Sequence, residues 1–168
     1  VVYGGFTAGA TRLNLAVTDG RLEANGLAAL ADDGSLSIGV TADAKVLPPS
    51  VSVSLDAEDA QAQPLLGTLL GASQITGVGS YSAEVSAAGQ TQEELAGTMK
   101  GKASLSLIDG RISGTDLAGL FVAARQKILD GWSAAPGGTP FSSLKGEAEI
   151  ADGIATIRGA SLVTPSIT

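Results

Sequence analysis

The 168-residue sequence contains no cysteine and no histidine. The missing cysteine excludes disulfides, zinc–thiolate sites and cysteine nucleophiles. The missing histidine excludes Ser-His-Asp triads, histidine metal ligands and the commonest general base. The glycine pairs at 77–79 and 137–138 lack the spacing of dinucleotide- or phosphate-binding loops. We therefore expect no enzyme, no catalytic residue, no metal site and no cofactor.

Charge and aromatic residues are also scarce, at 16% and 4% of the chain. The net charge of −7 argues against nucleic acid as a partner and against a polybasic membrane-surface patch. No apolar run approaches the roughly 18 residues that span a bilayer, and the first residues have no signal-peptide pattern. The length suits one domain, and both ends have strand-like sequence. We expect residues 1–168 to be a single domain cut from a longer chain.

Glycine is abundant, with 23 residues, and the dipeptide Asp-Gly divides the alternating stretches. It occurs at 19–20, 33–34, 109–110 and 152–153, and it favours the type I′ turn of two-residue hairpins. A fifth copy at 130–131 follows helical sequence and is expected to end a helix. Four hairpins are therefore predicted.

Two-residue turns fix which side chains lie opposite each other. At the first turn, the predicted pairs are Val17 with Leu22, Leu15 with Ala24, and Leu13 with Gly26. At the second they are Ala31 with Leu36, Ala29 with Ile38, and Leu27 with Val40. At the third they are Leu107 with Ile112, and Leu105 with Gly114. At the last they are Ile150 with Ala155, Ala148 with Ile157, and Gly146 with Gly159, with the charge pair Glu147–Arg158 on the other face.

Three stretches have helical rather than alternating spacing. Residues 64–71 form a short predicted helix with Pro64 near its start, and Thr91 to Glu94 form a capping box. The main predicted helix spans 116–130, with a stripe that should be buried against the sheet: Leu117, Leu120, Phe121, Ala124 and Ile128. The predicted fold is mainly β with minor α, a curved antiparallel meander of about eight to ten strands, including a long strand at 75–88. Both helices should lie on its apolar face.

Two groups of residues could serve other purposes. Asp56, Glu58 and Asp59 precede the short helix, where carboxylates favour the helix dipole. They could also offer oxygen ligands to calcium, although no EF-hand spacing supports that reading. Trp132 and Phe141 flank the Gly/Pro loop, where they either cover one end of the core or contact a partner.

The apolar face of the predicted sheet is larger than its helices can cover. A helix is about 10 Å wide, whereas strands lie about 4.8 Å apart. Either the sheet folds onto itself as a closed core, or part of the face awaits a ligand or neighbouring sequence. In the first half of the chain this face carries Leu13, Leu15, Val17, Leu22, Leu36, Ile38, Val40, Val51, Val53 and Leu55.

Two stretches resemble the C-terminal region of the AsmA family of bacterial envelope proteins. The first is DGRISGTDLAGLFVAARQKIL followed by TPFSSLKGEAEIADGIATIRGASLVTPSI, and the second is LDAEDAQAQPLLGTLLG followed by ITGVGSYSAEVSAAG. The resemblance covers the chain from about Leu13 to its end. The chain stops where the family usually continues into further strands.

The resemblance implies a protein anchored in the inner membrane by an N-terminal helix, with its bulk in the periplasm and a role in outer-membrane biogenesis. Family members are similar to bridge-like lipid carriers, in which an apolar β-groove holds acyl chains, and the family supplies no catalytic residues. The expected partner is thus phospholipid or another acyl lipid, bound by the ten apolar residues named above. The alternative is a structural domain with a closed core and no lipid, which docks other envelope proteins.

Overall fold

A computed structural model describes residues 2–3, 6–7, 9–30, 33–70, 74–113 and 138–165. The predicted helix at 116–130, with its stripe from Leu117 to Ile128, lies outside these residues. So do Trp132 and the Asp-Gly pair at 130–131.

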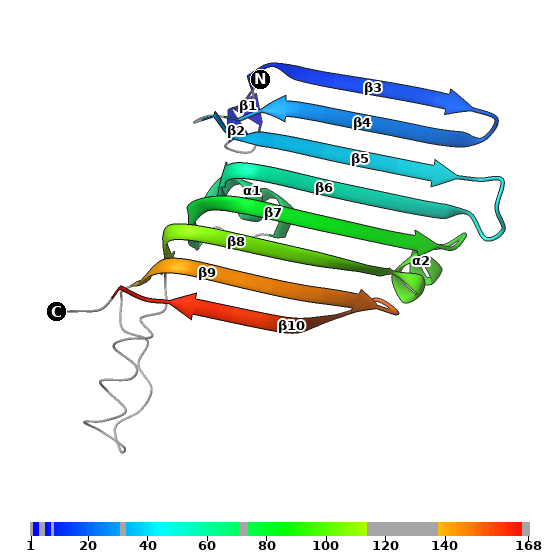
Figure 1. The fold of residues 1–168 in the computed structure, drawn as a ribbon. Helices are drawn as coiled ribbons and strands as arrows, with labels where there is room; N and C mark the ends of the chain where they lie inside the picture. Colours follow the sequence, from blue (N-terminus) through cyan, green and yellow to red (C-terminus); the bar gives the residue numbers. More distant parts are fainter. Residues whose placement is uncertain are drawn as a thin grey trace.

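The described chain forms one open antiparallel sheet of eight strands (Figure 1). Each strand pairs with its neighbours in the sequence, so that β3 and β10 are the two edges. The strands are β3 (Thr11–Thr18), β4 (Arg21–Ala29), β5 (Ser35–Asp43), β6 (Ser50–Gln61), β7 (Ile75–Ala88), β8 (Lys100–Ser113), β9 (Gly138–Ala151) and β10 (Ile154–Val163). The short strands β1 (Val2–Tyr3) and β2 (Phe6–Thr7) pair separately. The predicted fold class is confirmed, and so is the long strand at 75–88.

Two of the four predicted Asp-Gly hairpins have the expected turn. Asp19 and Gly20 have φ of 49° and 77°, and Asp152 and Gly153 have φ of 51° and 75°. Positive φ at both central residues defines the type I′ turn, whose twist matches that of the strands. The β3–β4 register is as predicted, with Val17 opposite Leu22, Leu15 opposite Ala24 and Leu13 opposite Gly26.

The predicted two-residue turn at 33–34 is wrong. Asp33 has a positive φ of 63°, but Gly34 does not share it. The Leu30 N–H donates to the Gly34 carbonyl, which closes a wider loop. A Cβ on Gly34 would lie 2.6 Å from the carbonyl oxygen of Asp59, so glycine is required here by close packing.

The wider loop changes the β4–β5 register. The observed pairs are Gly26 with Ile38, Ala28 with Leu36, and Leu27 with Ser37, instead of Ala29 with Ile38 and Leu27 with Val40. This register places most apolar residues of β3, β4 and β5 on one face. Leu27, Ala16 and Ala29 lie on the opposite face.

The predicted hairpin at 109–110 is also wrong, because β8 runs through it without turning. Asp109 has φ of 49°, and Asp109 and Gly110 together lie opposite Gly77, which is a β-bulge. Leu107 pairs with Gly79 and Leu144, and Ile112 pairs with Ile75 and Thr139.

The final hairpin is confirmed near its turn and wrong beyond it. Ile150 lies opposite Ala155 and Ala148 opposite Ile157, but a bulge at Arg158 places Gly146 opposite Ala160 instead of Gly159. Arg158 forms its ion pair with Glu149, with 2.7 Å between Nε and Oε2, instead of with Glu147. Glu147 and Glu149 are two residues apart in β9 and therefore share a face, so Arg158, which pairs with Glu149, lies on the predicted polar face with Glu147.

Two short helices complete the described fold. α1 (Ala62–Leu70) agrees with the helix predicted at 64–71, and α2 (Gln92–Thr98) follows the predicted capping box. The Glu94 N–H donates to Thr91 Oγ1 at 3.2 Å, and the Glu94 carboxylate accepts from the Gln90 N–H at 2.6 Å. Thr91 thus caps the helix as predicted, whereas the Glu94 carboxylate reaches back one residue further than in the standard box, to the residue before the cap.

The core lies under α1, at one end of the sheet (Figure 1). Leu65 and Leu66 of α1 pack against Tyr81, Leu107 and Phe141 of three neighbouring strands. Phe141 is buried, which agrees with the first of its two predicted roles, covering one end of the core.

Asp56, Glu58 and Asp59 are not at a helix terminus. All three lie within β6, where Asp59 has φ of 49° in a second bulge, and α1 has no acidic residue in its first turn. Asp56 accepts a hydrogen bond from the Ser82 hydroxyl at 2.9 Å. Nowhere in the described ranges do three or more acidic residues gather as metal ligands would.

Candidate functional site: an open apolar face

Cross-strand rows of apolar and small side chains cross the whole sheet on one face. Strand pairing places these residues side by side, because each antiparallel pair keeps opposite residues on the same side. One row is Leu13, Gly26, Ile38, Leu55, Ala83, Ala103, Ala148 and Ile157, and the next is Leu15, Ala24, Val40, Val53, Val85, Gly101, Ile150 and Ala155. We call this side of the sheet the apolar face.

All ten residues predicted as an apolar surface lie on the apolar face, and none of them is buried. Leu13, Leu15 and Val17 of β3 are 71%, 66% and 70% exposed. Ile38 and Val53 are also exposed, whereas Leu22, Leu36, Val40, Val51 and Leu55 are half-buried. Side chains of this size are normally removed from water in a core.

Cover by α1 and the sheet edge together explain the unequal exposure. α1 contacts β6 and β7, and the residues beneath it, Tyr81 and Leu107, are buried. Exposure is greatest on β3, an edge strand with a neighbour on one side only. Among the described elements, the apolar face is thus covered at one end and uncovered over the rest of its first half.

The sequence-based list of this surface omitted its second half. Ala148, Ile150 and Ile157 continue the same rows across β9 and β10, and Ile157 is 75% exposed. Their alternation in GEAEIADGIATI was the signal, but the false hairpin at 109–110 hid their continuity with β3 to β6.

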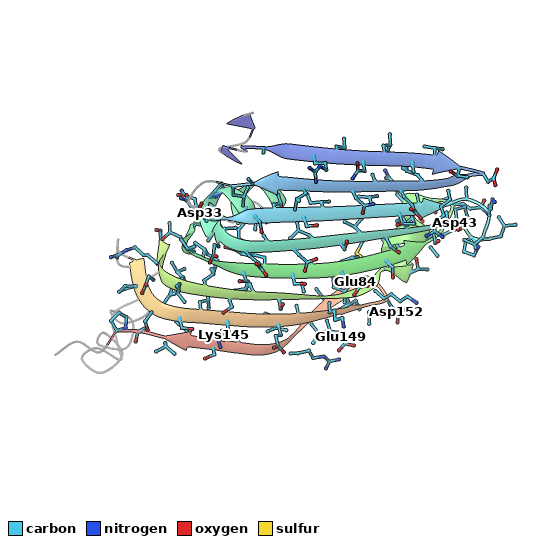
Figure 2. All side chains as sticks on the ribbon, turned by 45° about the horizontal axis from the view of Figure 1, so that its top comes forward. Asp33, Asp43, Glu84, Lys145, Glu149 and Asp152 are labelled. Carbon is cyan, nitrogen blue, oxygen red and sulfur yellow. The ribbon has the colours of Figure 1, made fainter. Side chains whose placement is uncertain are left out.

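The opposite face carries serine, threonine and charged residues, and we call it the polar face. One row of it places Glu84, Lys102 and Glu149 side by side with alternating charge; Glu84 and Glu149 are labelled in Figure 2. A shallow groove of about 950 Å³ is lined by polar-face residues, Ser52, Ser86, Lys102, Glu147, Glu149 and Arg158 among them, and also by Val85, Ala103, Ala148 and Ile150.

Tyr81 is the one residue whose ionisation clearly departs from its ordinary behaviour among the described groups. Burial under α1 raises the pKa of the Tyr81 phenol well above its usual 10.0, because a phenolate would lose its hydration there. Within the described residues the Tyr81 hydroxyl has no hydrogen-bond partner. The buried residues of the same cluster are apolar, Leu65, Leu107 and Phe141 among them.

The family model of the AsmA family matches residues 7–159 of the chain. The chain belongs to the AsmA family. This membership indicates a function connected with the bacterial envelope, in a family that is not known for enzymatic activity. No curated protein and no solved structure matches the chain. Neither helix of the described parts is long and apolar enough to cross a membrane.

Proposed function

We propose that this AsmA-family chain is a non-enzymatic periplasmic module that binds phospholipid or another acyl lipid along the apolar face. It belongs to an inner-membrane-anchored protein that acts in outer-membrane biogenesis. The observation that carries the proposal is the exposure of Leu13, Leu15 and Val17 along β3, together with that of Ile38 and Val53 on the same face. A large exposed apolar surface is unusual on a soluble domain and marks an interaction site.

The face suits acyl chains for a simple physical reason. Each methylene that leaves water gains roughly 0.8 kcal/mol, and this gain makes little demand on geometry. Aliphatic and small side chains are therefore sufficient, and eight strands offer a surface about 34 Å across at a spacing of about 4.8 Å. The polar face can remain in water while lipid occupies the other side.

The second candidate function is a structural or protein-interaction domain. Among the described strands, β3 and β10 are both edges and do not meet, so the sheet does not close as a barrel. The observation in its favour is that β3 has a hydrogen-bonded neighbour on one side only among the described strands. Such an edge can accept a strand from a partner.

Mass spectrometry of lipid that co-purifies with the protein tests the proposal. We expect wild-type protein to carry phospholipid, and the double variant Val17→Asp/Ile38→Asp to carry none. Leu27→Asp is the matched control, because Leu27 is an exposed aliphatic residue on the polar face, opposite Ser37. It should keep its lipid.

The same preparations separate the two functions. Circular dichroism must first show that the double variant is folded, because Val17 is 70% exposed but Ile38 is only 37% exposed. Folded wild-type protein that carries no lipid would contradict the proposal. A protein partner captured by wild type and lost on Leu13→Pro in β3 would then favour the interaction role. Leu13 lies at a non-hydrogen-bonded position opposite Gly26, so its N–H faces the open edge, and proline removes this donor to an added strand.

A further inference from the structure

The loop between β5 and β6 presents apolar side chains to solvent at the end of the sheet away from α1. It comprises residues 44–49, Ala-Lys-Val-Leu-Pro-Pro, and β6 runs from this loop to α1 (Figure 1). Leu47 is 83% exposed, more than any other large apolar residue that the structure describes, and Val46 is 46% exposed. From Val46 to Pro49 there is no polar side chain. Loops are normally rich in polar residues, so this composition calls for a reason.

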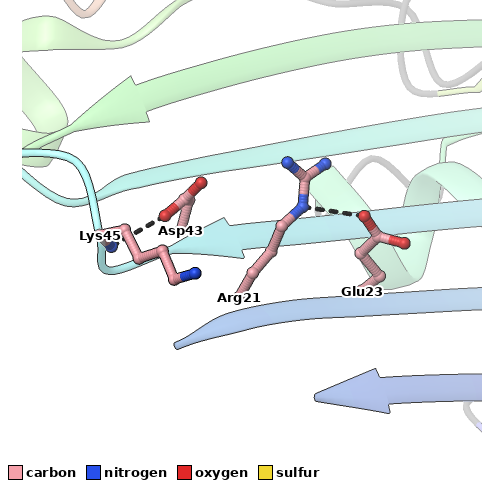
Figure 3. A network of polar contacts seen from close by, with 4 residues as sticks. All are labelled: Arg21, Glu23, Asp43 and Lys45. Atoms are coloured by element: carbon pink, nitrogen blue, oxygen red, sulfur yellow. Dashed lines mark hydrogen bonds and ion pairs between the residues drawn. The ribbon is translucent and has the colours of Figure 1, made fainter. Parts of the chain in front are cut away.

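The base of this loop is attached to its neighbours on both sides. The Ala44 N–H donates to the Gly20 carbonyl at 3.0 Å, and the Gly89 N–H donates to the Pro49 carbonyl at 2.8 Å. Lys45 is fixed twice: its N–H donates to Asp43 Oδ1 at 2.8 Å (Figure 3), and its Nζ lies 3.6 Å from Asp19 Oδ2. Hydrogen bonds and an ion pair therefore fix both ends of the loop, while Val46 and Leu47 between them are exposed to solvent.

The charges around the base are paired and nearly balanced. Besides the contacts of Lys45, Arg21 Nε lies 2.8 Å from Glu23 Oε1 (Figure 3). Two cations, Arg21 and Lys45, face three anions, Asp19, Glu23 and Asp43, which leaves a net charge of −1. The loop thus has no basic patch that would attract an anionic surface.

The size of the apolar tip indicates which kind of partner it fits. Two aliphatic side chains and two prolines offer only a few hundred Å², whereas a stable protein interface needs about 800 Å² on each side. A lipid interface has no such minimum area, because each CH₂ that enters it gains about 0.8 kcal/mol, and a gain of this size supports a weak and reversible contact.

We propose that the β5–β6 loop inserts Val46 and Leu47 into the interfacial layer of a bilayer of zwitterionic phospholipid. This goes beyond the proposed function, because the loop can enter a bilayer whether or not acyl chains bind the apolar face. Insertion would place this end of the sheet, opposite α1, against the membrane.

Flotation of the 168-residue chain with phosphatidylcholine vesicles tests the insertion. We expect wild type and Leu27→Asp to float with the vesicles, and Leu47→Asp to lose at least about tenfold in partitioning. Leu47→Asp should leave thermal unfolding unchanged, because the side chain is 83% exposed. Adding anionic lipid should not strengthen binding, given the charge of −7.

A fluorescent reporter gives a second readout. In Leu47→Trp/Trp132→Phe the new indole should shift to the blue and be quenched by brominated phosphatidylcholine, whereas in the control Ser37→Trp/Trp132→Phe it should not. Equal flotation of Leu47→Asp and wild type, or no flotation of wild type, would overturn the proposal. So would loss of flotation in Val17→Asp/Ile38→Asp with Leu47→Asp unaffected, which would assign membrane contact to the apolar face. Self-association that Leu47→Asp abolishes, without vesicle binding, would assign the tip to a second copy of the chain.

Discussion

The same substitution at two positions of the apolar face should have very different effects on stability. Leu107 is fully buried beneath α1, whereas Leu15 is 66% exposed on β3. Leu→Ala removes about three methylene equivalents, worth roughly 2.4 kcal/mol when they are fully buried. At Leu107 a cavity between Leu65, Leu66 and Phe141 adds to this loss, so we expect about 3–5 kcal/mol in total.

At Leu15 only about a third of the side chain leaves water on folding, so Leu15→Ala should cost about 0.8 kcal/mol. Urea unfolding followed by far-ultraviolet circular dichroism measures the difference. With a slope of about 2 kcal/mol per molar urea, the two midpoints should differ by about 1–2 M. Equal losses at both positions would mean that the face is packed at β3 as tightly as under α1, and the open face would be refuted.

Two further predictions concern the buried phenol and the cap of α2. Burial raises the pKa of the Tyr81 phenol in the folded state, so above pH 10.0 the unfolded chain loses this proton first and stability falls as pH rises. Tyr81→Phe should remove the part of this decline that falls between pH 9 and 11. The variant should also be more stable by about 1 kcal/mol, because the substitution deletes a hydroxyl without a hydrogen-bond partner. A variant less stable in urea than wild type would show that the hydroxyl is hydrogen-bonded. Thr91→Ala should cost about 1 kcal/mol and lower the melting temperature by about 2–4 °C, whereas Thr91→Ser should not, since it keeps the acceptor of the Glu94 N–H.

The alternation of the sequence predicted the sheet because strand side chains have a period of two. The turns were harder to predict, because one dipeptide serves three purposes. In all four described copies of Asp-Gly the aspartate has a positive φ, but only Gly20 and Gly153 share it. At Asp33 and Asp109 the left-handed residue forms a wider loop and a bulge. The choice depends on partners that are distant in the sequence: Gly34 packs against Asp59, and Gly110 packs against the Phe141 ring.

The candidate site was predictable where it depends on alternation within a strand, and not where it depends on strand register. The ten residues of the first half lie on one face because alternation within each strand is a local property. The continuation through Ala148, Ile150 and Ile157 depended on the register of β8, which local sequence did not reveal. The charge partner of Arg158 was missed because the bulge at this residue has no signature of its own in the sequence.

Photo-crosslinking in living cells tests the central claim most directly. A benzophenone amino acid is placed at Leu15 on the apolar face or at its neighbour Asn14 on the polar face, in the same edge strand β3. After irradiation and purification, mass spectrometry measures phospholipid attached to each variant. We predict adducts at Leu15 and none at Asn14. No phospholipid at either position, or equal amounts at both, would contradict the account.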